Sequence, residues 1–562
     1  MPRFFGQADG IRFKQAVRLE LCGVAIISQL YNNIRRVGLQ LLLQSAVIFL
    51  LKNEPLCGII IWIREPDGSH NTLDGDFMAE KTVRTRYAPS PTGFMHVGNL
   101  RTALYEYLVA KSQGGKFILR IEDTDRERLV EGAVDFIYNT LKLAGLKHDE
   151  GPDVGGDFGP YVQSERRDMY LPYAEQLINE GKAYRCFCTK ERLEAIQSES
   201  AGGGYDRHCR DLPQEEIDRL LAEGTPYVIR QKMPLEGSTT FSDAVFGDIT
   251  VENSELQDQI LIKTDGYPTY NFANVIDDHT MGITHVVRGS EYLSSTPKYN
   301  LLYEAFGWEI PTYIHLPLIM GKDEDGNVSK LSKRHGATGF YDLIEDGYLP
   351  QAIINYIALL GWCPKDNTEI FTLGELEQAF SIDGISKSPA VFDYDKLSWF
   401  NGEYIKAMSA DEFTAAAMPY YRQVFGEKDM PYEKFAEILQ KRVTQLTQIP
   451  EMIDFFAALP EYDKQLFVNK KSKTNLDNAP GVLSEAYERL KALPAWEAEP
   501  IHDCLINMAK EKELKNGTVM WPVRIAAAGK TVTPGGAIEI LDILGREESL
   551  ARLEKGLEIL NN

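Results

Sequence analysis

A loop near residue 90 combines small residues, a histidine and an amide side chain just before an apolar helical pattern. It reads YAPSPTGFMHVGN over residues 87–99. The N-terminus of a helix offers unpaired N–H groups and the positive end of its dipole, which suits a triphosphate. Gly93 and Gly98 let the backbone approach such a ligand closely. The loop therefore predicts a phosphate site, although a proline-rich turn with one incidental histidine would give the same pattern.

A second loop, far downstream, is basic in an acidic chain. It reads SKLSKRHG over residues 329–336 and follows the turn DEDGN at 323–327. Lysine ammonium groups on a mobile loop neutralise charge that develops on phosphate oxygens during phosphoryl transfer. Alone, such a loop is most often a solvated face. Its occurrence together with the first loop favours a shared role in handling a nucleotide triphosphate.

The elements around the first loop form a predicted βαβ unit. Residues 82–87 are typical of a strand, and residues 116–122 of a second one. Between them, apolar residues follow the i, i+3, i+4, i+7 spacing of an amphipathic helix, which Gly114 and Gly115 end. These apolar positions are Leu100, Ala103, Leu104, Tyr107 and Leu108. The first loop thus joins a strand to a helix N-terminus.

Further strands and helices alternate as far as about residue 340. Residues 284–288 and 314–320 read as strands, and Pro297 marks a helix start. Alternation of this kind predicts a parallel sheet, here interrupted by an insertion at 183–261. Beyond residue 340 long helical patterns dominate, for example Glu433 to Gln448 and Ser549 to Leu560. The C-terminal third is therefore predicted to be all helical.

Composition limits the class of protein. The 562 residues contain 44% hydrophobic residues, which excludes a disordered or fibrous chain, and carry a formal charge of −22, which disfavours nonspecific nucleic-acid binding. Seven cysteines without a recognisable secretory signal indicate reduced thiols and a cytoplasmic location. The apolar run at 39–51 contains Gln40 and Gln44 and is too short to span a membrane, so no membrane partner is expected.

Several motifs carry a resemblance to a known family. HVGN at 96–99 and KLSKR at 330–334 resemble the His-Ile-Gly-His and Lys-Met-Ser-Lys-Ser signatures of class I aminoacyl-tRNA synthetases. Within that class, four segments are similar to motifs of the glutamyl-tRNA synthetases, and the resemblance runs from about residue 82 to the C-terminus. These segments are RYAPSPTG at 86–93, RIEDTD at 120–125, DGYPTY at 265–270 and VIDDH at 275–279.

The resemblance implies an α/β fold with a Rossmann-type catalytic domain, an inserted connective domain and an all-helical anticodon-binding region. The segment at 1–77 has no consistent period and is expected to lie outside the enzyme fold. The implied domains are 78–182 and 262–325 for the two catalytic halves, 183–261 for the insertion, 326–398 for a stem-contact region with the KLSKR loop, and 399–562 for the anticodon-binding domain.

The two signature loops are implied to bind ATP. His96, Lys330 and Lys333 are the expected catalytic residues, and Gly98, Asn99 and Ser332 are expected to contact ATP beside them. Asn99 departs from the general class motif, which has histidine there; an amide still donates a hydrogen bond but cannot carry a proton's charge. For His96 the structural alternative is a packing histidine that caps the helix.

Glutamate needs partners for two carboxylates and one ammonium group. By resemblance, Arg86 and Arg288 bind carboxylates, and Ser90 and Glu122 bind the ammonium. Tyr270 and Asn274 are expected to shape the pocket, and Glu291 and Tyr292 to contact substrate or the tRNA end. Glu122 stands beside Asp123 and Asp125, so a structural ion-pair network is its alternative role.

The insertion contains Cys186, Cys188 and Cys209. Many family members bind structural zinc at this place through Cys-x-Cys and Cys-x-His pairs. Here Asp211 occupies the last position, and a carboxylate oxygen can ligate zinc. A zinc site formed by these four residues and a group of unmetallated thiols both remain open.

The implied reaction uses ATP and Mg²⁺ to activate L-glutamate as the adenylate and transfers the acyl group to tRNA-Glu, with tRNA-Gln as a further acceptor to be tested. The chain is expected to act as a monomer. Arg442, in the run QKRVTQL, is expected to help select the third anticodon base. The competing interpretations are a glutaminyl-tRNA synthetase, whose anticodon modules are β-barrels, and a non-catalytic tRNA-binding relative.

Overall fold

The computed structural model divides into two compact units, Met1–Lys81 and Thr82–Asn562. In the first unit the structure describes three strands, β1 (Ala46–Leu50), β2 (Ile59–Arg64) and β3 (His70–Leu73), which form an antiparallel sheet. In the second it describes every residue except 94, 126–127, 200–203, 324, 333–334 and 337–338. The second unit begins where the family motifs begin.

The predicted βαβ unit is confirmed. Strand β4 (Arg84–Tyr87) and strand β5 (Lys116–Leu119) pair in parallel, with Arg86 opposite Ile118. Helix α3 (Val97–Ser112) connects them and buries its apolar positions. The helix ends before Gly114, which has a φ of 65° that L side chains rarely adopt. The first loop therefore leads directly from β4 into the N-terminus of α3.

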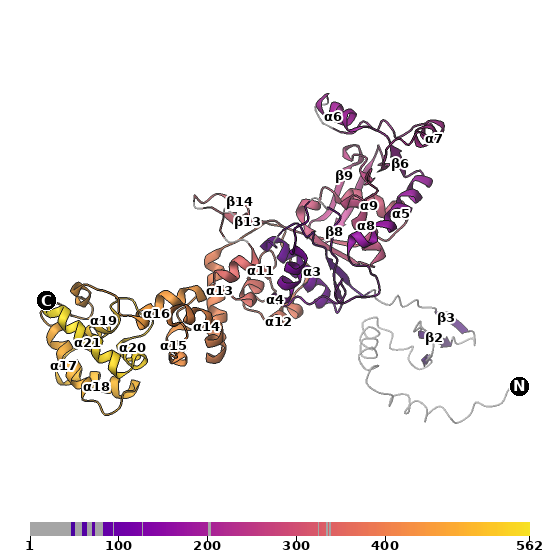
Figure 1. The fold of residues 1–562 in the computed structure, drawn as a ribbon. Helices are drawn as coiled ribbons and strands as arrows, with labels where there is room; N and C mark the ends of the chain where they lie inside the picture. Colours follow the sequence, from indigo (N-terminus) through magenta and orange to yellow (C-terminus); the bar gives the residue numbers. More distant parts are fainter. Residues whose placement is uncertain are drawn as a thin grey trace, which may run out of the picture. The chain divides into compact units, whose positions relative to one another are not determined.

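A four-stranded sheet, which we call the main sheet, combines strands from distant parts of the chain, and two of them, β8 and β9, are labelled in Figure 1. Its order is β11 (His285–Gly289), β12 (Thr312–Leu316), β8 (Ser238–Asp243) and β9 (Gly247–Glu252), of which only β9 runs antiparallel to its neighbour. Strand β11 lies beside β4, because the Thr284 N–H donates to the Arg84 carbonyl at 3.0 Å. The two halves of the predicted catalytic domain thus meet where β4 lies beside β11.

The sheet topology differs from the predicted limits of the insertion. Strands β8 and β9 fall within 183–261, yet β8 pairs with β12 of the main sheet. The rest of that interval forms a separate sheet of β6 (Ala183–Cys186), β7 (Val228–Gln231) and β10 (Ile260–Ile262). The sequence predicted one continuous insertion at 183–261. The strand pairing instead places β8 and β9, from the middle of that interval, in the main sheet.

The remaining elements of this part are short helices around the two sheets. Helix α8 (Tyr270–Thr280) packs on helix α9 (Thr296–Phe306), and α9 contacts β8. The bounds are α4 (Ala133–Leu143), α5 (Arg167–Asn179), α6 (Lys190–Glu199), α7 (Gln214–Ala222), α8 (Tyr270–Thr280) and α9 (Thr296–Phe306), with single 3-10 turns at Gln163–Arg166, Asn253–Glu255 and Ser290–Tyr292.

The segment that carries the basic loop packs on the catalytic core. Strand β13 (Ile319–Lys322) pairs with β14 (Val328–Lys330) as a hairpin and in parallel with β15 (Ala390–Val391). Helices α11 and α12 contact α3, so their apolar faces complete one hydrophobic core. The helices are α10 (Phe340–Glu345), α11 (Pro350–Ala358), α12 (Leu373–Ala379) and α13 (Tyr394–Ala407).

The C-terminal part is helical, as predicted; in the described chain no strand follows β15. Helices α17 to α21 gather in one group (Figure 1). Buried Arg552 of α21 donates to the carbonyl of Ala527 within this group and to that of Phe455 in the preceding helix, α16 (Ile449–Ala457). The helices are α14 (Ala410–Phe425), α15 (Tyr432–Leu439), α16 (Ile449–Ala457), α17 (Ala479–Lys491), α18 (Ala498–Glu511), α19 (Asn516–Ala528), α20 (Ala537–Leu544) and α21 (Arg546–Asn561).

The helical pattern from Glu433 to Gln448 was predicted as one helix, and this is wrong. Helix α15 ends at Leu439, and only a 3-10 turn at Leu446–Gln448 follows before α16. The side chain of Gln440 donates to the carbonyls of Ile405 and Met408, at 3.0 and 2.6 Å. Tertiary hydrogen bonds therefore hold the chain in a turn where periodicity alone favoured continued helix.

No helix in the described part of the chain has the length and apolar character needed to cross a membrane.

Candidate active site

His96 is the N-cap of α3, so the structural role considered for it is present. The N–H of Gly98 donates to His96 Nδ1 at 3.1 Å. His96 also forms an isolated β-bridge with Gly339, three residues beyond the basic loop. The structure thus brings the first loop beside the chain that leaves the second loop. Asn99 is exposed in the first turn of α3.

The basic loop is anchored by a histidine that the sequence did not single out. His335 is buried, and its Nδ1 accepts a hydrogen bond from the Ser332 N–H at 3.1 Å. Its ring packs over Gly321, where an added Cβ would lie 2.6 Å away. Lys330 ends β14 with an exposed side chain. Lys333 lies outside the described residues.

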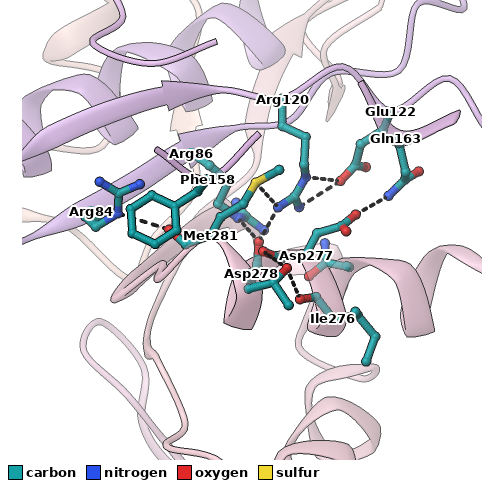
Figure 2. A network of polar contacts seen from close by, with 12 residues as sticks. Arg84, Arg86, Arg120, Glu122, Phe158, Gln163, Ile276, Asp277, Asp278 and Met281 are labelled. Atoms are coloured by element: carbon teal, nitrogen blue, oxygen red, sulfur yellow. Dashed lines mark hydrogen bonds and ion pairs between the residues drawn. The ribbon is translucent and has the colours of Figure 1, made fainter. Parts of the chain in front are cut away.

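Arg86 lies in a buried ion-pair network, which we call the Arg86 cluster: Arg86, Glu106, Arg120, Glu122 and Asp278. Arg86 Nη1 donates to Glu106 at 3.0 Å and Nε to Asp278 at 3.0 Å. Arg120 donates to the same Asp278 oxygen at 2.7 Å and to Glu122 at 2.9 Å. Figure 2 shows Arg120 between Glu122 and Asp278. The cluster joins β4, α3 and α8 with the residues that follow β5.

Burial and charge compete in the Arg86 cluster. For Asp278, burial raises the pKa, but Arg86 and Arg120 outweigh it and hold the pKa below its usual value. For Glu106 and Glu122, burial dominates and raises the pKa in spite of the arginines. Three carboxyl groups thus face two guanidinium groups. A cationic ligand group beside Glu122, such as an ammonium, would favour the ionised form of this carboxyl.

Glu122 takes part in the ion-pair network that was its alternative role. Both hydrogen bonds from Arg120 reach the same oxygen, Oε1. These bonds leave Oε2 as a second acceptor, so the network and a contact with substrate are compatible.

Arg288 occupies a different environment. It is 5% exposed, and no carboxylate of a described residue lies within ion-pair distance of it. Its Nε donates to His315 at 3.1 Å and its Nη2 to Thr296 at 2.9 Å. Its guanidinium carbon lies 4.5 Å from the ring centre of Tyr299. Neutral groups and aromatic faces support this cation, so its positive charge remains available to an anionic ligand.

Tyrosine rings surround Arg288. Burial raises the pKa of Tyr299, with opposite contributions from Arg288 and Glu122, so the ring is within electrostatic reach of both. Tyr270 lies 5.9 Å from Tyr292 between ring centres and accepts a hydrogen bond from buried Asn274. Tyr292 in turn has its ring centre 5.4 Å from the guanidinium carbon of Arg288. Ser90 is exposed in the first loop, and its carbonyl accepts from the Thr92 N–H.

Glu106, Asp243 and His315 were not among the residues predicted for the site. Glu106 could have been found, because it is a charged residue among the apolar positions of α3. Asp243 and His315 gave no local signal. Each lies on a strand, and only strand pairing brings them to Arg288.

The thiols of Cys186, Cys188 and Cys209 lie within 4.8 Å of one another, as a metal site requires. Asp211 is not in this group; its carboxylate pairs with Lys232 at 2.8 Å. The Tyr205 hydroxyl instead lies 3.2 Å from Cys186 and 4.0 Å from Cys188. The three thiols are donors of the kind that zinc prefers, and the phenol oxygen is the fourth polar group beside them.

Arg442 is exposed in the turn after α15, and its N–H donates to the Leu439 carbonyl. It is therefore in a turn between helices and not on a helix face.

The family models agree with this arrangement. Residues 82–399 match the model described as tRNA synthetases class I (E and Q), catalytic domain, and residues 412–557 match an anticodon binding domain. The chain is 59% identical over 482 residues to a glutamate–tRNA ligase from Clostridium botulinum, covering 85% of this chain and 98% of the relative. A glutamate–tRNA ligase from Clostridium kluyveri is 58% identical over the same length.

The chain is also similar to solved structures of glutamate–tRNA ligases. A glutamate–tRNA ligase from Elizabethkingia meningosepticum, in complex with its amino acid, aligns with a TM-score of 0.78 at 37% identity, covering 85% of this chain and all of the other. A glutamate–tRNA synthetase from Elizabethkingia anophelis aligns with a TM-score of 0.77 at 38% identity. With its catalytic and anticodon-binding regions both matched, the chain belongs to the class I tRNA synthetases, in the family of the glutamate–tRNA ligases.

Proposed function

We propose that this protein activates L-glutamate with ATP and transfers it to the 3′ end of tRNA-Glu. The observation that carries the proposal is the polarity of the site. The Arg86 cluster has more carboxyl than guanidinium groups, whereas buried Arg288 lacks a carboxylate partner among the described residues. An amino acid with an ammonium at one end and a carboxylate at the other complements such a pocket.

In the first step the α-carboxylate oxygen of glutamate attacks the α-phosphorus of ATP. An O–P bond forms and the bond to pyrophosphate breaks, giving glutamyl-adenylate. We expect the N-terminus of α3, Lys330 and Lys333 to stabilise phosphate charge. His96, Gly98, Asn99 and Ser332 would contact ATP beside them. Mg²⁺, when bound with ATP, would add charge neutralisation at the phosphates.

In the second step the terminal ribose hydroxyl of tRNA attacks the carbonyl carbon of the adenylate. The ester bond forms, AMP leaves and the hydroxyl proton is released. Neither step needs a side-chain nucleophile, so catalysis comes from positioning and electrostatic stabilisation. Glu122 and Ser90 would hold the ammonium, and Arg288 a carboxylate. Arg86 would contribute Nη2, which neither of its bonds to Glu106 and Asp278 uses.

Two competing functions are disfavoured. A glutaminyl-tRNA synthetase has β-barrel anticodon modules, whereas residues 392–562 contain no strand. A non-catalytic relative would keep the fold without both signature loops, and this chain has both.

We propose that Cys186, Cys188, Cys209 and Tyr205 hold a structural zinc ion, which would fix the region around β6. Asp211 is replaced in this role by Tyr205 because its carboxylate is paired with Lys232. Metal analysis of the purified protein tests the site: one zinc per chain, lost in Cys209→Ser, supports it, and metal-free folded protein contradicts it.

ATP–pyrophosphate exchange in the presence of tRNA tests the main proposal. Exchange should depend on glutamate and be far weaker with glutamine; no exchange with either amino acid would refute it. Charging of purified tRNA-Glu and tRNA-Gln with labelled glutamate then defines the acceptors. Lys333→Ala should lower kcat by on the order of 10²–10³, as for loss of one preorganised donor, with Lys330→Ala as the comparison.

For the anticodon region, we propose that Arg442 helps to choose between tRNA-Glu and tRNA-Gln from its exposed turn. Arg442→Gln should change the ratio of the two charging rates, and an unchanged ratio contradicts the assignment. We also propose that the enzyme is a cytoplasmic monomer and that residues 1–77 are dispensable. Size measurement in solution and the activity of a chain starting at Met78 test these points.

A further inference from the structure

The strand register of the main sheet brings three residues from distant parts of the sequence together. On β11 and β12, Arg288 pairs directly with His315. On β12 and β8, Tyr313 pairs with Asp243, two residues from His315 along the strand. Arg288, His315 and Asp243 are 5%, 0% and 3% exposed. None of the three can therefore change partners without disturbing the sheet around it.

Hydrogen bonds connect these residues in a line. Arg288 Nε donates to His315 Nε2 at 3.1 Å, and His315 Nδ1 lies 2.7 Å from Asp243 Oδ2. The Asp243 carboxylate is itself held by backbone N–H groups. Oδ1 accepts from Val245 and Phe246 at 2.9 and 2.7 Å, and Oδ2 accepts from the His315 N–H at 3.1 Å. The far end of the line is thus fixed by the turn that follows β8.

These contacts determine where the imidazole proton lies. His315 Nε2 must be an acceptor, because an arginine can only donate. The proton is then on Nδ1, where it is donated to Asp243. Burial and the adjacent positive charge of Arg288 both lower the pKa of His315, whereas Asp243 raises it. The net shift is downward, which keeps the ring neutral.

The hydrogen bonds to His315 and Thr296 also fix the orientation of the Arg288 guanidinium group. The bonds to His315 and Thr296 use Nε and one N–H of Nη2. Thr296 donates its hydroxyl to the Tyr292 carbonyl at 2.9 Å, so its oxygen is available as an acceptor. Both bonds lie on one edge of the planar guanidinium, and its remaining N–H groups face away from them.

We propose that His315 and Asp243 are positioning residues for substrate binding: together they hold Arg288 in the orientation in which its remaining N–H groups receive a carboxylate of glutamate. This rests on the proposed role of Arg288. Neither residue touches the substrate. Their role is comparable to that of the residues that hydrogen-bond to metal-binding histidines and orient them. Substitution of such residues typically lowers metal affinity or activity by about 10–100-fold.

Two substitutions at His315 separate orientation of Arg288 from general support of the sheet. His315→Asn keeps an amide that can donate to Asp243 but places no acceptor near the position of Nε2. His315→Gln is longer and can place its amide oxygen there. We expect His315→Asn to raise the glutamate KM by about 10–100-fold with the ATP KM within about twofold, and His315→Gln to recover most of the loss. His285→Asn, on β11 outside the pocket, is the matched control.

A double substitution adds a readout that a structural role would not produce. If His315 acts only through Arg288, adding His315→Asn to Arg288→Ala should leave the glutamate KM of Arg288→Ala unchanged, because coupled substitutions are not additive. The melting temperature of each variant establishes that it is folded. Asp243→Asn should reproduce the selective effect of His315→Asn.

Three results would overturn the proposal. The first is a glutamate KM within about twofold of the parent in folded His315→Asn. The second is equal increases in the KM values for glutamate and ATP, which indicate general damage. The third is an additive effect in the double variant. If Arg288→Ala itself leaves the glutamate KM unchanged, the role of Arg288 in the proposed function fails too, whereas a large effect there with none in His315→Asn removes only the positioning role.

Discussion

Arg86 and Arg288 are both buried arginines on neighbouring strands, yet their surroundings are opposite. Arg86 is 3% exposed and bonded to two carboxylates, Glu106 and Asp278. Arg288 is 5% exposed and bonded to a neutral histidine and a threonine hydroxyl. Both were expected to bind carboxylates of glutamate. Residue type and burial alone therefore do not decide what a buried arginine can offer to a ligand.

The difference follows from how each charge is stabilised. Removing a guanidinium from water costs several kcal/mol, and in the Arg86 cluster ion pairs offset this cost. Around Arg288, hydrogen bonds and the faces of Tyr299, Tyr313 and Tyr292 do so, the nearest ring centre being 4.5 Å away. A paired arginine mainly stabilises the fold, whereas one supported by neutral groups keeps a net charge for an anion.

Asp278→Ala should have the largest effect, on stability. It leaves Arg86 and Arg120 without the carboxylate they share, and breaking a buried pair in this way costs about 3–5 kcal/mol. The free energy of unfolding, from urea denaturation, measures the change. A loss below about 1 kcal/mol, as for an exposed pair, would show that Asp278 is not central to the cluster.

Arg288→Lys should affect binding more than stability. A lysine cannot keep the planar set of donors that meets His315, Thr296 and a carboxylate together. We expect kcat/KM for glutamate to fall by about 10², or about 3 kcal/mol, with a change in unfolding free energy below about 1 kcal/mol. A variant that loses stability and keeps its glutamate KM would reverse the distinction between the two arginines.

The pH dependence of stability should reveal Asp278 but not Arg288. The folded-state pKa of Asp278 is lowered, so its stabilising contribution is present above the unfolded-state pKa of about 3.9 and is lost as pH falls through the folded-state pKa. The stability difference between the parent and Asp278→Asn should therefore shrink below about pH 4, by up to about 1.4 kcal/mol per pH unit. The difference between the parent and Arg288→Lys should lack this decrease, and a parallel decrease in both would contradict the comparison.

Tyr299→Leu should have the smallest effect. It removes the aromatic face nearest to Arg288, and a cation–π contact contributes about 0.5–2 kcal/mol. We expect the glutamate KM to rise by about three- to tenfold. Tyr299→Phe keeps the ring and loses the hydrogen bonds of the hydroxyl, such as the one to Asn271, so it should stay close to the parent. Equal effects of the two substitutions would mean that the hydroxyl, and not the ring, matters.

Much of the architecture could be predicted from local patterns. The βαβ unit around α3, the strand at β11 and the helical C-terminal region follow from apolar periodicity, which the chain carries within short windows. The same patterns incorrectly predicted that the helix continues after Leu439. The hydrogen bonds from Gln440 to Ile405 and Met408 that hold the turn there join residues more than thirty positions apart, which a local pattern does not reveal.

The sequence by itself determined which residues are available for chemistry: two signature loops, two arginines and a cysteine group. Tertiary structure decided what each can do. Asp278 is 192 positions from Arg86, Asp243 is 72 from His315, and Asp211 lies close to the cysteines in sequence but is paired with Lys232. Local periodicity carries no information on such partners, because strand order and register determine which carboxylate meets which cation.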